Sequence, residues 1–298
     1  MKAFVTGAAG MLGTSLLPVL REHEHTIAAT DIRFLDDDMG KLDVRNFEEM
    51  SRVISDFGPD ILYHLAAETN LETCEEQVDY AYETNFVGTQ NACMVCRNLG
   101  IPLVYVSTAG VFDGTKLEPY TEFDNPNPIN VYGSSKLEGE KIVREILPEH
   151  YVVRAGWMIG GADRDRKFVH KIMDQLDNGT KTIHAVTDRT GTPTYAPAFS
   201  RVLEKLIRTG RYGTYHLACK GRASRFEVAR EMLRILNRSD VSIKPVTSDF
   251  FKEEFFAPRP RSEEMRNYVL DLISMNDMPH WGESLNTYLQ TFFADRFH

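Results

Sequence analysis

Three glycines at a spacing of three, Gly7, Gly10 and Gly13, follow a short apolar run at the start of the chain and precede a helical pattern. A glycine-rich turn in this position constrains the fold strongly, because it is typical of the first βαβ unit of a dinucleotide-binding domain. The first glycine permits the tight turn, the second lets the backbone approach a pyrophosphate, and the third allows close packing of helix on sheet. The sequence therefore predicts a cofactor phosphate site at these glycines and at Met11 and Leu12, where the helix supplies oriented N–H groups.

Short β-branched runs alternate with longer amphipathic segments, which is typical of βαβ units and a parallel sheet. The expected strands are 3–6, 26–30, 61–65, 103–107 and 151–154, and the expected later helices are 46–57, 80–99, 168–178, 196–209 and 225–237. We predict an α/β fold, with a Rossmann-type doubly wound parallel sheet and a smaller, interleaved C-terminal substrate-binding domain. Residues 1–157 are expected to form the cofactor domain and 158–298 mainly the substrate domain, with segments near 187–218 returning to the first.

Composition narrows the classes of function. The chain has 298 residues, of which 42% are hydrophobic and 26% charged, and such a balance is typical of a globular protein. A net charge of -9 without a long basic run argues against a general nucleic-acid binder. No apolar stretch approaches the ~20 residues of a membrane span, and the first residues resemble a strand rather than a signal peptide. We therefore expect a cytoplasmic protein with neither nucleic-acid nor membrane partners.

The four cysteines are too few and too scattered for a disulfide framework in a chain of this length. Cys93 and Cys96 form a C-x-x-C pair, but they lie in an apolar-periodic run without a second pair or a histidine at ligand spacing. Buried helix thiols explain this pattern better than a metal or redox centre does, and we predict no metal site.

Asp31 ends the second expected strand, where an acidic residue accepts hydrogen bonds from the adenosine ribose. This position favours NAD(H) over NADP(H) as the cofactor. Arg33 lies two residues further on and could instead face a 2′-phosphate, so NADP(H) stays open.

Tyr132 and Lys136 are four residues apart at the start of an expected helix, which places the phenol and the ammonium on one face. Thr108 and Ser107 end an expected strand about 25 residues earlier, at the edge where open α/β sheets bind their ligands. Reduction of a ketone by hydride needs a proton donor, and a free tyrosine with a pKa of ~10 exchanges its proton poorly. We expect Lys136 to lower the Tyr132 pKa, Tyr132 to act as general acid, and Thr108 to orient the carbonyl, with Ser107 as the alternative hydroxyl.

These motifs, together with Arg154 to Trp157, resemble the extended short-chain dehydrogenases/reductases, and most closely the dTDP-4-dehydrorhamnose reductase family. The similarity covers nearly the whole chain. Its more specific parts are Val111 to Gly114, Gly191 to Tyr195, Gly213 to Leu217 and Ala257 to Ser262. The resemblance implies reduction of a 4-keto group on a nucleotide-activated 6-deoxysugar by NAD(P)H, and a homodimer through the Tyr132 helix and its neighbour.

The resemblance also implies roles for single residues. Thr108, Tyr132 and Lys136 are catalytic, the last two also bind the cofactor, and Trp157 lines the sugar pocket. The further positions along the cofactor are Asp43, Val44, Ala66, Ala67 and Asn85. Arg259, which lies between prolines, could pair with the substrate diphosphate through its planar fork, or remain solvated.

The chain departs from the family pattern at two places. Such reductases commonly carry Asp-Tyr after the Ser-Thr pair, but Ala109 and Gly110 follow here, which removes an aromatic ring near the substrate. Asn70-Leu71-Glu72 replaces the usual valine-aspartate pair at the pocket edge. Because small residues at 109–110 also suit a nucleotide-sugar 4-epimerase, that activity stays an alternative. A non-catalytic nucleotide-binding regulatory subunit is a second alternative, since fold alone does not separate it from an enzyme.

Overall fold

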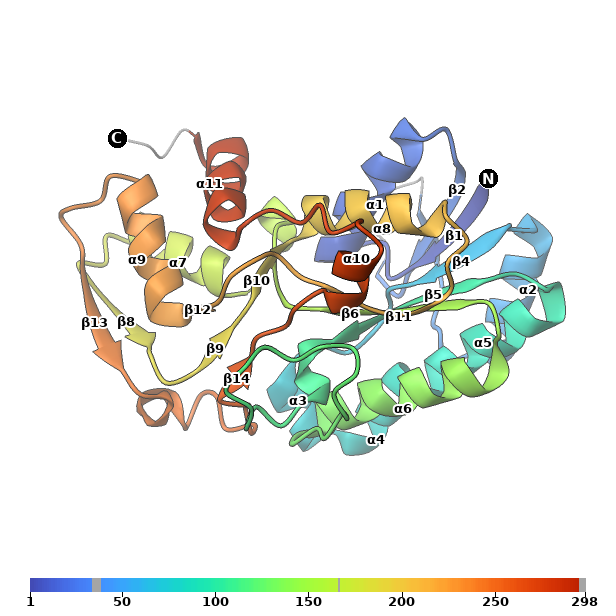
Figure 1. The fold of residues 1–298 in the computed structure, drawn as a ribbon, viewed down its shortest axis with the longest axis horizontal. Helices are drawn as coiled ribbons and strands as arrows, with labels where there is room; N and C mark the ends of the chain where they lie inside the picture. The colour runs from blue at the N-terminus through green and yellow to red at the C-terminus, as the bar shows by residue number, and fades with distance from the viewer. Residues whose placement is uncertain (34–38, 166, 295–298) are drawn as a thin grey trace.

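A seven-stranded sheet organises the larger part of the computed structural model, which describes residues 1–33, 39–165 and 167–294 (Figure 1). All neighbouring strands in it are parallel. Their order is β11 (Gly213–Leu217), β6 (His150–Ala155), β5 (Leu103–Thr108), β4 (Ile61–His64), β1 (Lys2–Thr6), β2 (Thr26–Asp31) and β3 (Met39–Lys41). The chain builds outward from β1 in one direction and from β4 in the other, so the switch point of the sheet lies between these two strands.

Helices cover both faces of this sheet (Figure 1). One face carries α1 (Met11–Glu22) and α8 (Ala196–Ile207), and the other carries α2 (Phe47–Phe57), α5 (Gly88–Leu99) and α6 (Val131–Ile146). Alternate residues of β1 enter different cores: Ala3 and Val5 pack on the α1 side, and Phe4 packs on the α2 side. Burial on both faces explains why the strands are nearly continuous apolar runs.

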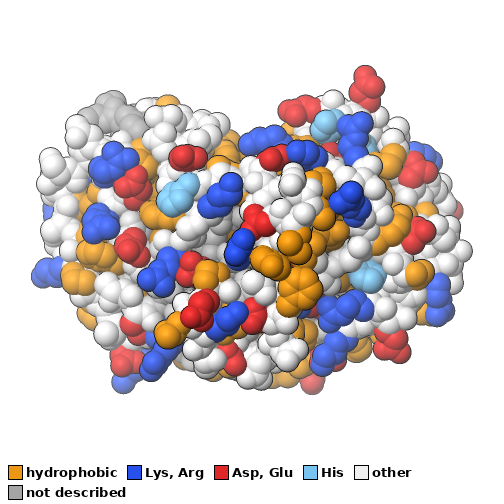
Figure 2. Space-filling view, viewed as in Figure 1, with side chains coloured by type: hydrophobic (Ala, Val, Ile, Leu, Met, Phe, Trp, Pro, Cys, Tyr) orange, Lys and Arg blue, Asp and Glu red, His pale blue; other side chains and the backbone are white. Residues whose placement is uncertain are grey.

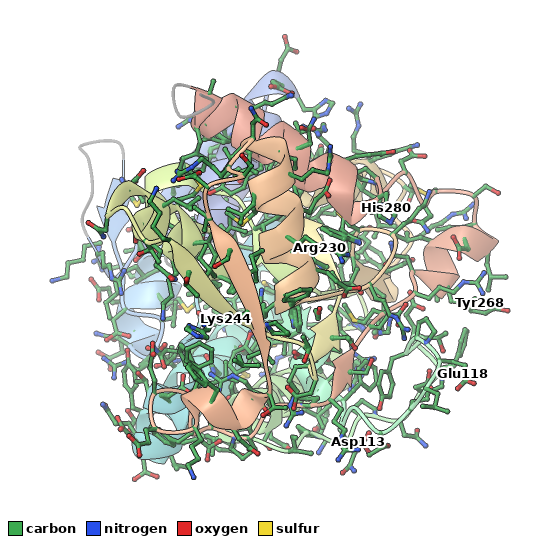
Figure 3. The ribbon with its side chains drawn as sticks, turned by 90° about the vertical axis from the view of Figure 1, so that its left-hand side faces the viewer. Asp113, Glu118, Arg230, Lys244, Tyr268 and His280 are labelled. Atoms are coloured by element: carbon green, nitrogen blue, oxygen red, sulfur yellow. The ribbon has the colours of Figure 1, made fainter. Side chains whose placement is uncertain are left out.

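A smaller lobe follows the sheet domain. It contains α7 (Phe168–Asp177), β8 (Thr182–Val186), α9 (Arg225–Ile235), β13 (Ser242–Val246) and α11 (Trp281–Phe292), with β8 and β13 parallel. Figure 3 looks at the end of this lobe, where α9, marked by Arg230, lies against β13, marked by Lys244. The apolar side chains of this lobe are continuous with the core under α1 and α8, so the two parts are packed as one body.

Short strands connect the two parts. β7 (Trp157–Ile159) pairs with β10 (Pro193–Tyr195), and β9 (Thr190–Gly191) lies between β12 (Ala223–Ser224) and β14 (Ser262–Glu263). After β10 the chain re-enters the sheet domain as α8 and β11.

The fold class predicted from the sequence is confirmed, since the five expected strands are β1, β2, β4, β5 and β6. The helix expected at 80–99 is divided into α4 (Val78–Tyr82), a π-helical turn (Glu83–Val87) and α5. The remaining short elements are α3 (Leu71–Glu76), α10 (Tyr268–Leu272) and 3-10 turns at Ala109–Val111, Ala162–Arg164 and Ser248–Phe251.

Within the described residues, every helix is too short or too polar to cross a bilayer. Figure 2 shows acidic and basic side chains intermingled over the face that it views.

Candidate active site

The glycine-rich turn lies at the switch point, against the end of β4. Gly7 has a φ of +69°, and a Cβ added to it would lie 2.5 Å from the backbone nitrogen of Ala66. A Cβ on Gly13 would lie 2.3 Å from the carbonyl oxygen of Ala8. Only glycine fits at either position, and at Gly7 the turn packs directly against the backbone of Ala66.

The first turn of α1 fits a phosphate group. Gly10 begins this helix in an extended conformation, and no side chain caps it. Its first turn also lacks an acidic residue that would repel an anion. The N–H groups of Met11 and Leu12 belong to the unpaired first turn that every helix has, and these donors suit a pyrophosphate.

Asp31 braces the glycine-rich turn. Its Oδ2 accepts a hydrogen bond from the Ala9 N–H at 3.0 Å, and its Oδ1 accepts one from the Arg33 N–H at 3.0 Å. The carboxylate is buried, whereas the Arg33 side chain is exposed. A negative charge is therefore held at the end of β2, next to the phosphate site.

Asp43 and Val44 lie between β3 and α2. The Asp43 carboxylate is held by the Arg45 guanidinium, with Oδ2 2.6 Å from one terminal nitrogen, and this bond is the main cause that lowers the Asp43 pKa. A Cβ on Gly88 would lie 2.8 Å from a methyl of Val44, and the Val44 carbonyl accepts a hydrogen bond from the Asn91 side chain at 2.9 Å. The Arg45 and Asn91 contacts were not foreseen from the sequence.

Asn85, in the π-helical turn, holds the segment that follows Ala67. Its amide oxygen accepts the Glu68 N–H at 2.8 Å, and its amide nitrogen donates to the Glu68 carbonyl and to the Ser135 hydroxyl, both at 3.0 Å. The side chain is fully buried. Asn85 thereby ties the loop after β4 to the helix that carries Tyr132.

Thr108 and Ser107 are placed in different surroundings. The Thr108 hydroxyl accepts the Gly110 N–H at 3.0 Å, and its interaction with the Tyr132 phenol acts to lower the pKa of that phenol. The Ser107 hydroxyl is buried and donates to Glu140 Oε1 at 2.6 Å. Successive residues of a strand face opposite sides, so Thr108 is the hydroxyl that the strand presents to Tyr132.

Tyr132 lies in the first turn of α6, which Asn130 caps by accepting the Gly133 N–H at 2.7 Å. The expected depression of the Tyr132 pKa is wrong for this structure. Burial of the phenol raises its pKa, and the hydrogen bond with Thr108 opposes this only in part. A phenol with a raised pKa remains protonated at neutral pH, as a proton donor must.

Lys136 lies one turn further along α6 and is almost fully buried. Its ammonium lies over the Tyr105 ring, 4.1 Å from the centroid. Burial lowers the Lys136 pKa to about 7, while the negative charge of Glu140 acts in the opposite direction.

A buried ionic network lies behind Lys136. Glu140 accepts two hydrogen bonds from Arg154, at 2.8 and 2.7 Å, and a third from Arg144 at 3.1 Å. The Glu140 pKa is lowered, because the bonds to Arg154 and Ser107 outweigh the cost of burial. Glu140 is four residues after Lys136 and so lies on the same side of α6.

The connecting strands β7 and β14 and the start of α9 contribute Trp157, Glu263 and Arg225 to the same region. The Trp157 indole N–H donates to Glu263 Oε2 at 2.6 Å, and the Arg225 guanidinium lies 3.9 Å from the indole centroid. Burial lowers the Arg225 pKa to about 10 and raises that of Glu263. The cations Arg225, Arg259 and Lys167 all favour the ionised form of Glu263.

Arg259 is an ion-pair partner in this structure. It donates to Glu72 Oε1 at 2.7 Å and to the Ala257 carbonyl at 2.9 Å. Glu72 is one of the residues that departs from the family pattern, so the longer acid places a counterion on the arginine at the pocket edge. The neighbouring Pro258 carbonyl accepts a hydrogen bond from Asn130 at 2.8 Å, which joins this tail to the start of α6.

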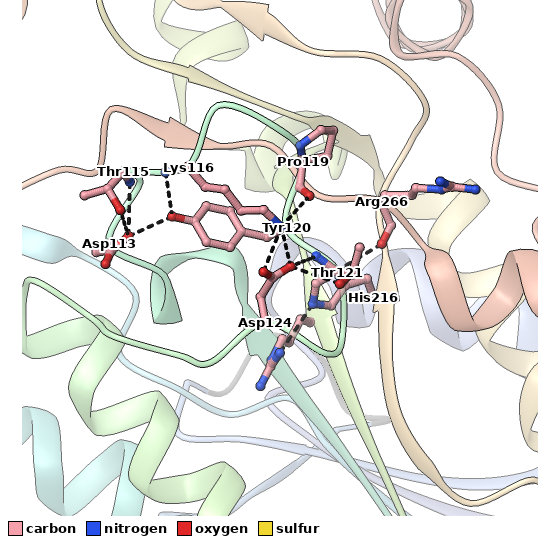
Figure 4. Close-up of polar contacts among 10 residues, drawn as sticks. Asp113, Thr115, Lys116, Pro119, Tyr120, Thr121, Asp124, His216 and Arg266 are labelled. Atoms are coloured by element: carbon pink, nitrogen blue, oxygen red, sulfur yellow. Dashed lines mark hydrogen bonds and ion pairs between the residues drawn. The ribbon is translucent and has the colours of Figure 1, made fainter.

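The loop after Thr108 fixes the segment that carries Glu263. The Tyr120 N–H donates to the Glu264 carbonyl, and the Tyr120 carbonyl accepts the Arg266 N–H, both at 2.8 Å. Figure 4 shows the side chains that hold this loop, with the Tyr120 hydroxyl on Asp113 at 2.7 Å. Glu263 is therefore presented from a braced strand rather than from a free loop.

The sequence did not identify Glu263, Arg225 or Lys167 as site residues. Arg225 begins α9, Lys167 precedes α7, and Glu263 lies in the two-residue strand β14, so hydrophobic periodicity does not show that these side chains meet. The available signal was the placement of Glu263 next to the Ala257 to Ser262 motif.

The sheet is parallel and doubly wound, and the glycine-rich turn lies at its switch point. Thr108 ends β5, and Tyr132 and Lys136 lie in the first half of α6. These features together define an extended short-chain dehydrogenase/reductase. Residues 1–293 match the family described as RmlD substrate binding domain, and the chain belongs to that family. The resemblance inferred from the motifs is thereby confirmed.

Named relatives agree with this assignment. The chain is 30% identical to the dTDP-4-keto-6-deoxy-D-glucose reductase of Streptomyces niveus, over 98% of this chain and 97% of the relative. A solved dTDP-4-dehydrorhamnose reductase from Clostridium acetobutylicum is 35% identical, with a TM-score of 0.89 and coverage of 98% of this chain and 99% of that one. The dTDP-4-dehydrorhamnose reductase of Bacillus anthracis, solved in complex with NADP, is 34% identical, with a TM-score of 0.87 and coverage of 97% and 99%.

Proposed function

We propose that this chain is a cytoplasmic enzyme that reduces the 4-keto group of a nucleotide-activated 6-deoxysugar with NAD(P)H. The observation that carries the proposal is that the first turn of α6, which carries Tyr132, packs against the backbone just after Thr108, with Lys136 one helical turn further along. The printed names of the relatives supply the substrate class. A regulatory subunit would not require this arrangement of donors.

The residues of the chain account for proton transfer and charge stabilisation. A dinucleotide bound at the glycine-rich turn supplies the hydride. As negative charge develops on the ketone oxygen, Thr108 donates a hydrogen bond to it and Tyr132 transfers its proton, which leaves a secondary alcohol. Lys136, when protonated, stabilises the phenolate that remains on Tyr132.

We propose NAD(H) as the preferred cofactor. The carboxylate of Asp31 lies buried at the end of β2, where it would accept hydrogen bonds from ribose hydroxyls and would repel a 2′-phosphate. Arg33 is the residue available to counter that repulsion, and the relative from Bacillus anthracis binds NADP. Dissociation constants for NADH and NADPH, measured on the wild type and on Asp31→Ala, test the proposal: the preference for NADH should disappear in the variant. A wild type that binds NADPH more tightly would contradict it.

Single-turnover oxidation of the cofactor tests the activity. NADH and NADPH are followed at 340 nm with a panel of nucleotide-linked 4-keto-6-deoxysugars. Tyr132→Phe is the inactive variant, and Tyr212→Phe is the control, because the Tyr212 side chain is exposed and its hydroxyl binds Glu149. We expect oxidation by the wild type and the control, with a loss of at least 100-fold in Tyr132→Phe. Cofactor binding without net oxidation on any sugar would instead support the epimerase or the regulatory subunit.

We also propose a homodimer in which α6 and its neighbour α5 form the contact. Sedimentation equilibrium at micromolar concentration tests this, and a mass equal to one chain would contradict it.

A further inference from the structure

A glycine and a carboxylate, Gly110 and Glu263, border the space beside Thr108. Gly110 has no side chain, and a Cβ added to it would lie 3.4 Å from Thr108 Oγ1 and 3.7 Å from Glu263 Oε1. The carboxylate of Glu263 therefore stands across Gly110 from the hydroxyl that orients the ketone. Position 110 is where the family pattern would place an aromatic residue.

The two oxygens of Glu263 differ in their contacts. Oε2 accepts the Trp157 indole N–H at 2.6 Å. Among the described residues, none donates a hydrogen bond to Oε1, which is the oxygen nearer to Gly110 and Thr108. The carboxylate thus presents one free acceptor toward the ketone site.

The indole that orients Glu263 is itself held in place. A Cβ on Gly191 would lie 2.3 Å from the Trp157 ring, so the glycine backbone packs directly against the indole. Arg225 stacks over the ring at 3.9 Å from the centroid. These contacts leave Trp157 little freedom, and the carboxylate that it binds is correspondingly fixed.

The space at Gly110 lies between Thr108 Oγ1 and Glu263 Oε1. When the ketone oxygen of a sugar accepts a hydrogen bond from Thr108, the oxygen on the adjacent C3 lies one carbon away. Because Thr108 Oγ1 and Glu263 Oε1 both lie within 4 Å of a Cβ built on Gly110, they are at most about 7 Å apart, and two hydrogen bonds of about 2.7 Å with the spacing of neighbouring sugar oxygens can span that distance. The C3 hydroxyl is a donor, and Glu263 Oε1 accepts no hydrogen bond from the residues that the structure describes.

We propose that Glu263 is a specificity-determining residue that accepts a hydrogen bond from the C3 hydroxyl of the 4-keto sugar. This inference rests on the proposed function. It assigns to the chain a preference for sugars that retain a hydroxyl next to the ketone, because a sugar without it leaves the partly buried carboxylate unpaired. A hydrogen bond to a charged group gives a preference of roughly 10- to 100-fold.

Binding titrations test the inference independently of turnover. A nucleotide-linked 4-keto-6-deoxysugar and its 3-deoxy analogue are titrated by calorimetry into the full chain with oxidised cofactor present. The proteins are the wild type, Glu263→Ala, Glu263→Gln and the control Glu264→Gln, whose neighbouring side chain faces Arg222 at 3.8 Å. The ratio of the two dissociation constants is compared within each protein, so differences in the folded fraction cancel.

We expect a ratio of roughly 10 to 100 in the wild type and the control, and a ratio near one in Glu263→Ala. Glu263→Gln should fall between them, because it keeps an acceptor oxygen without the charge. An unchanged ratio in Glu263→Ala, or equal weakening of both sugars, would overturn the inference. Since these titrations need no hydride transfer, a protein that binds with this preference but does not oxidise NAD(P)H contradicts only the proposed function.

Discussion

Gly133 packs so closely against Gly110 that a Cβ at position 133 would lie 2.1 Å from the Gly110 carbonyl oxygen. Gly133 directly follows Tyr132, and the Gly110 N–H donates a hydrogen bond to the Thr108 hydroxyl at 3.0 Å. This backbone contact therefore sets the distance between the two hydroxyl groups that act on the ketone.

Replacing Gly133 with alanine should impair catalysis more than it impairs cofactor binding. The added methyl forces α6 away from the loop after β5, and a displacement of about 1 Å in a catalytic group costs roughly 100-fold in rate. We expect kcat/KM for the sugar to fall by about that factor, with the dissociation constant of the cofactor changed by less than about threefold.

Gly282→Ala is the matched control for this variant. Its Cβ would meet ordinary contacts at 3.5 Å, and alanine is the better helix former in α11 by roughly 0.5–1 kcal/mol. Equal kcat/KM values for the two variants would show that the contact between Gly133 and Gly110 does not set the catalytic geometry.

The pH dependence of kcat/KM should follow the protonation of Lys136. With a pKa lowered to about 7, its ammonium loses its proton as the pH rises through neutrality, and its support for the Tyr132 phenolate is lost with it. Reduction should therefore slow above pH 7, approaching tenfold per pH unit. Lys136→Arg should move this decline, the alkaline limb of the kcat/KM profile, to higher pH, because a guanidinium stays protonated.

Lys141→Arg, an exposed change on the same helix, should leave the pH profile unaltered. A limb that remains near pH 7 in Lys136→Arg would assign the titration to another group.

Regular patterns in the sequence were sufficient to predict the sheet, the glycine-rich turn and the pairing of Tyr132 with Lys136 on one helix. They did not decide between Ser107 and Thr108, because both faces of β5 are buried and alternation of polarity is lost in such a strand. The structure separates the two hydroxyls through Glu140, a residue on α6 that binds Ser107.

The sugar-facing part of the site was harder to predict for a different reason. Glu263 lies in a two-residue strand and meets Trp157, which is 106 positions away in the chain. Contacts of this kind depend on the packing of the C-terminal lobe, and no local spacing encodes them. The Tyr132 pKa was also predicted in the wrong direction, since the sequence showed the nearby lysine but not the burial of the phenol.

Two buried histidines should make the fold less stable in mild acid. Burial lowers the pKa values of His64 and His216 to about 3, from an ordinary value near 6.5. Between these pH values the unfolded chain binds a proton at each site and the folded chain does not, so the free energy of unfolding falls as the pH falls. Each histidine lowers the free energy of unfolding by up to about 1.4 kcal/mol for every pH unit below its ordinary pKa, and it has no such effect at higher pH.

Urea unfolding at pH 7, 6 and 5 measures this slope. His216→Gln should be less stable at pH 7, since His216 contacts the Arg266 carbonyl at 3.2 Å, but its slope should be shallower than that of the wild type. Parallel slopes in the two proteins would mean that His216 titrates normally in the folded state.

Glu140 should matter for both stability and catalysis. Glu140→Gln leaves the buried Arg154 guanidinium without its anionic partner, and breaking a buried ion pair in this way costs about 3–5 kcal/mol. Glu138→Gln, which breaks an exposed pair with Lys141 on the same helix, should cost no more than about 1 kcal/mol in the same urea titrations. Because the charge of Glu140 raises the Lys136 pKa, its removal should also move the alkaline limb of kcat/KM to lower pH. A variant that loses stability but keeps that limb in place would confine Glu140 to a structural role.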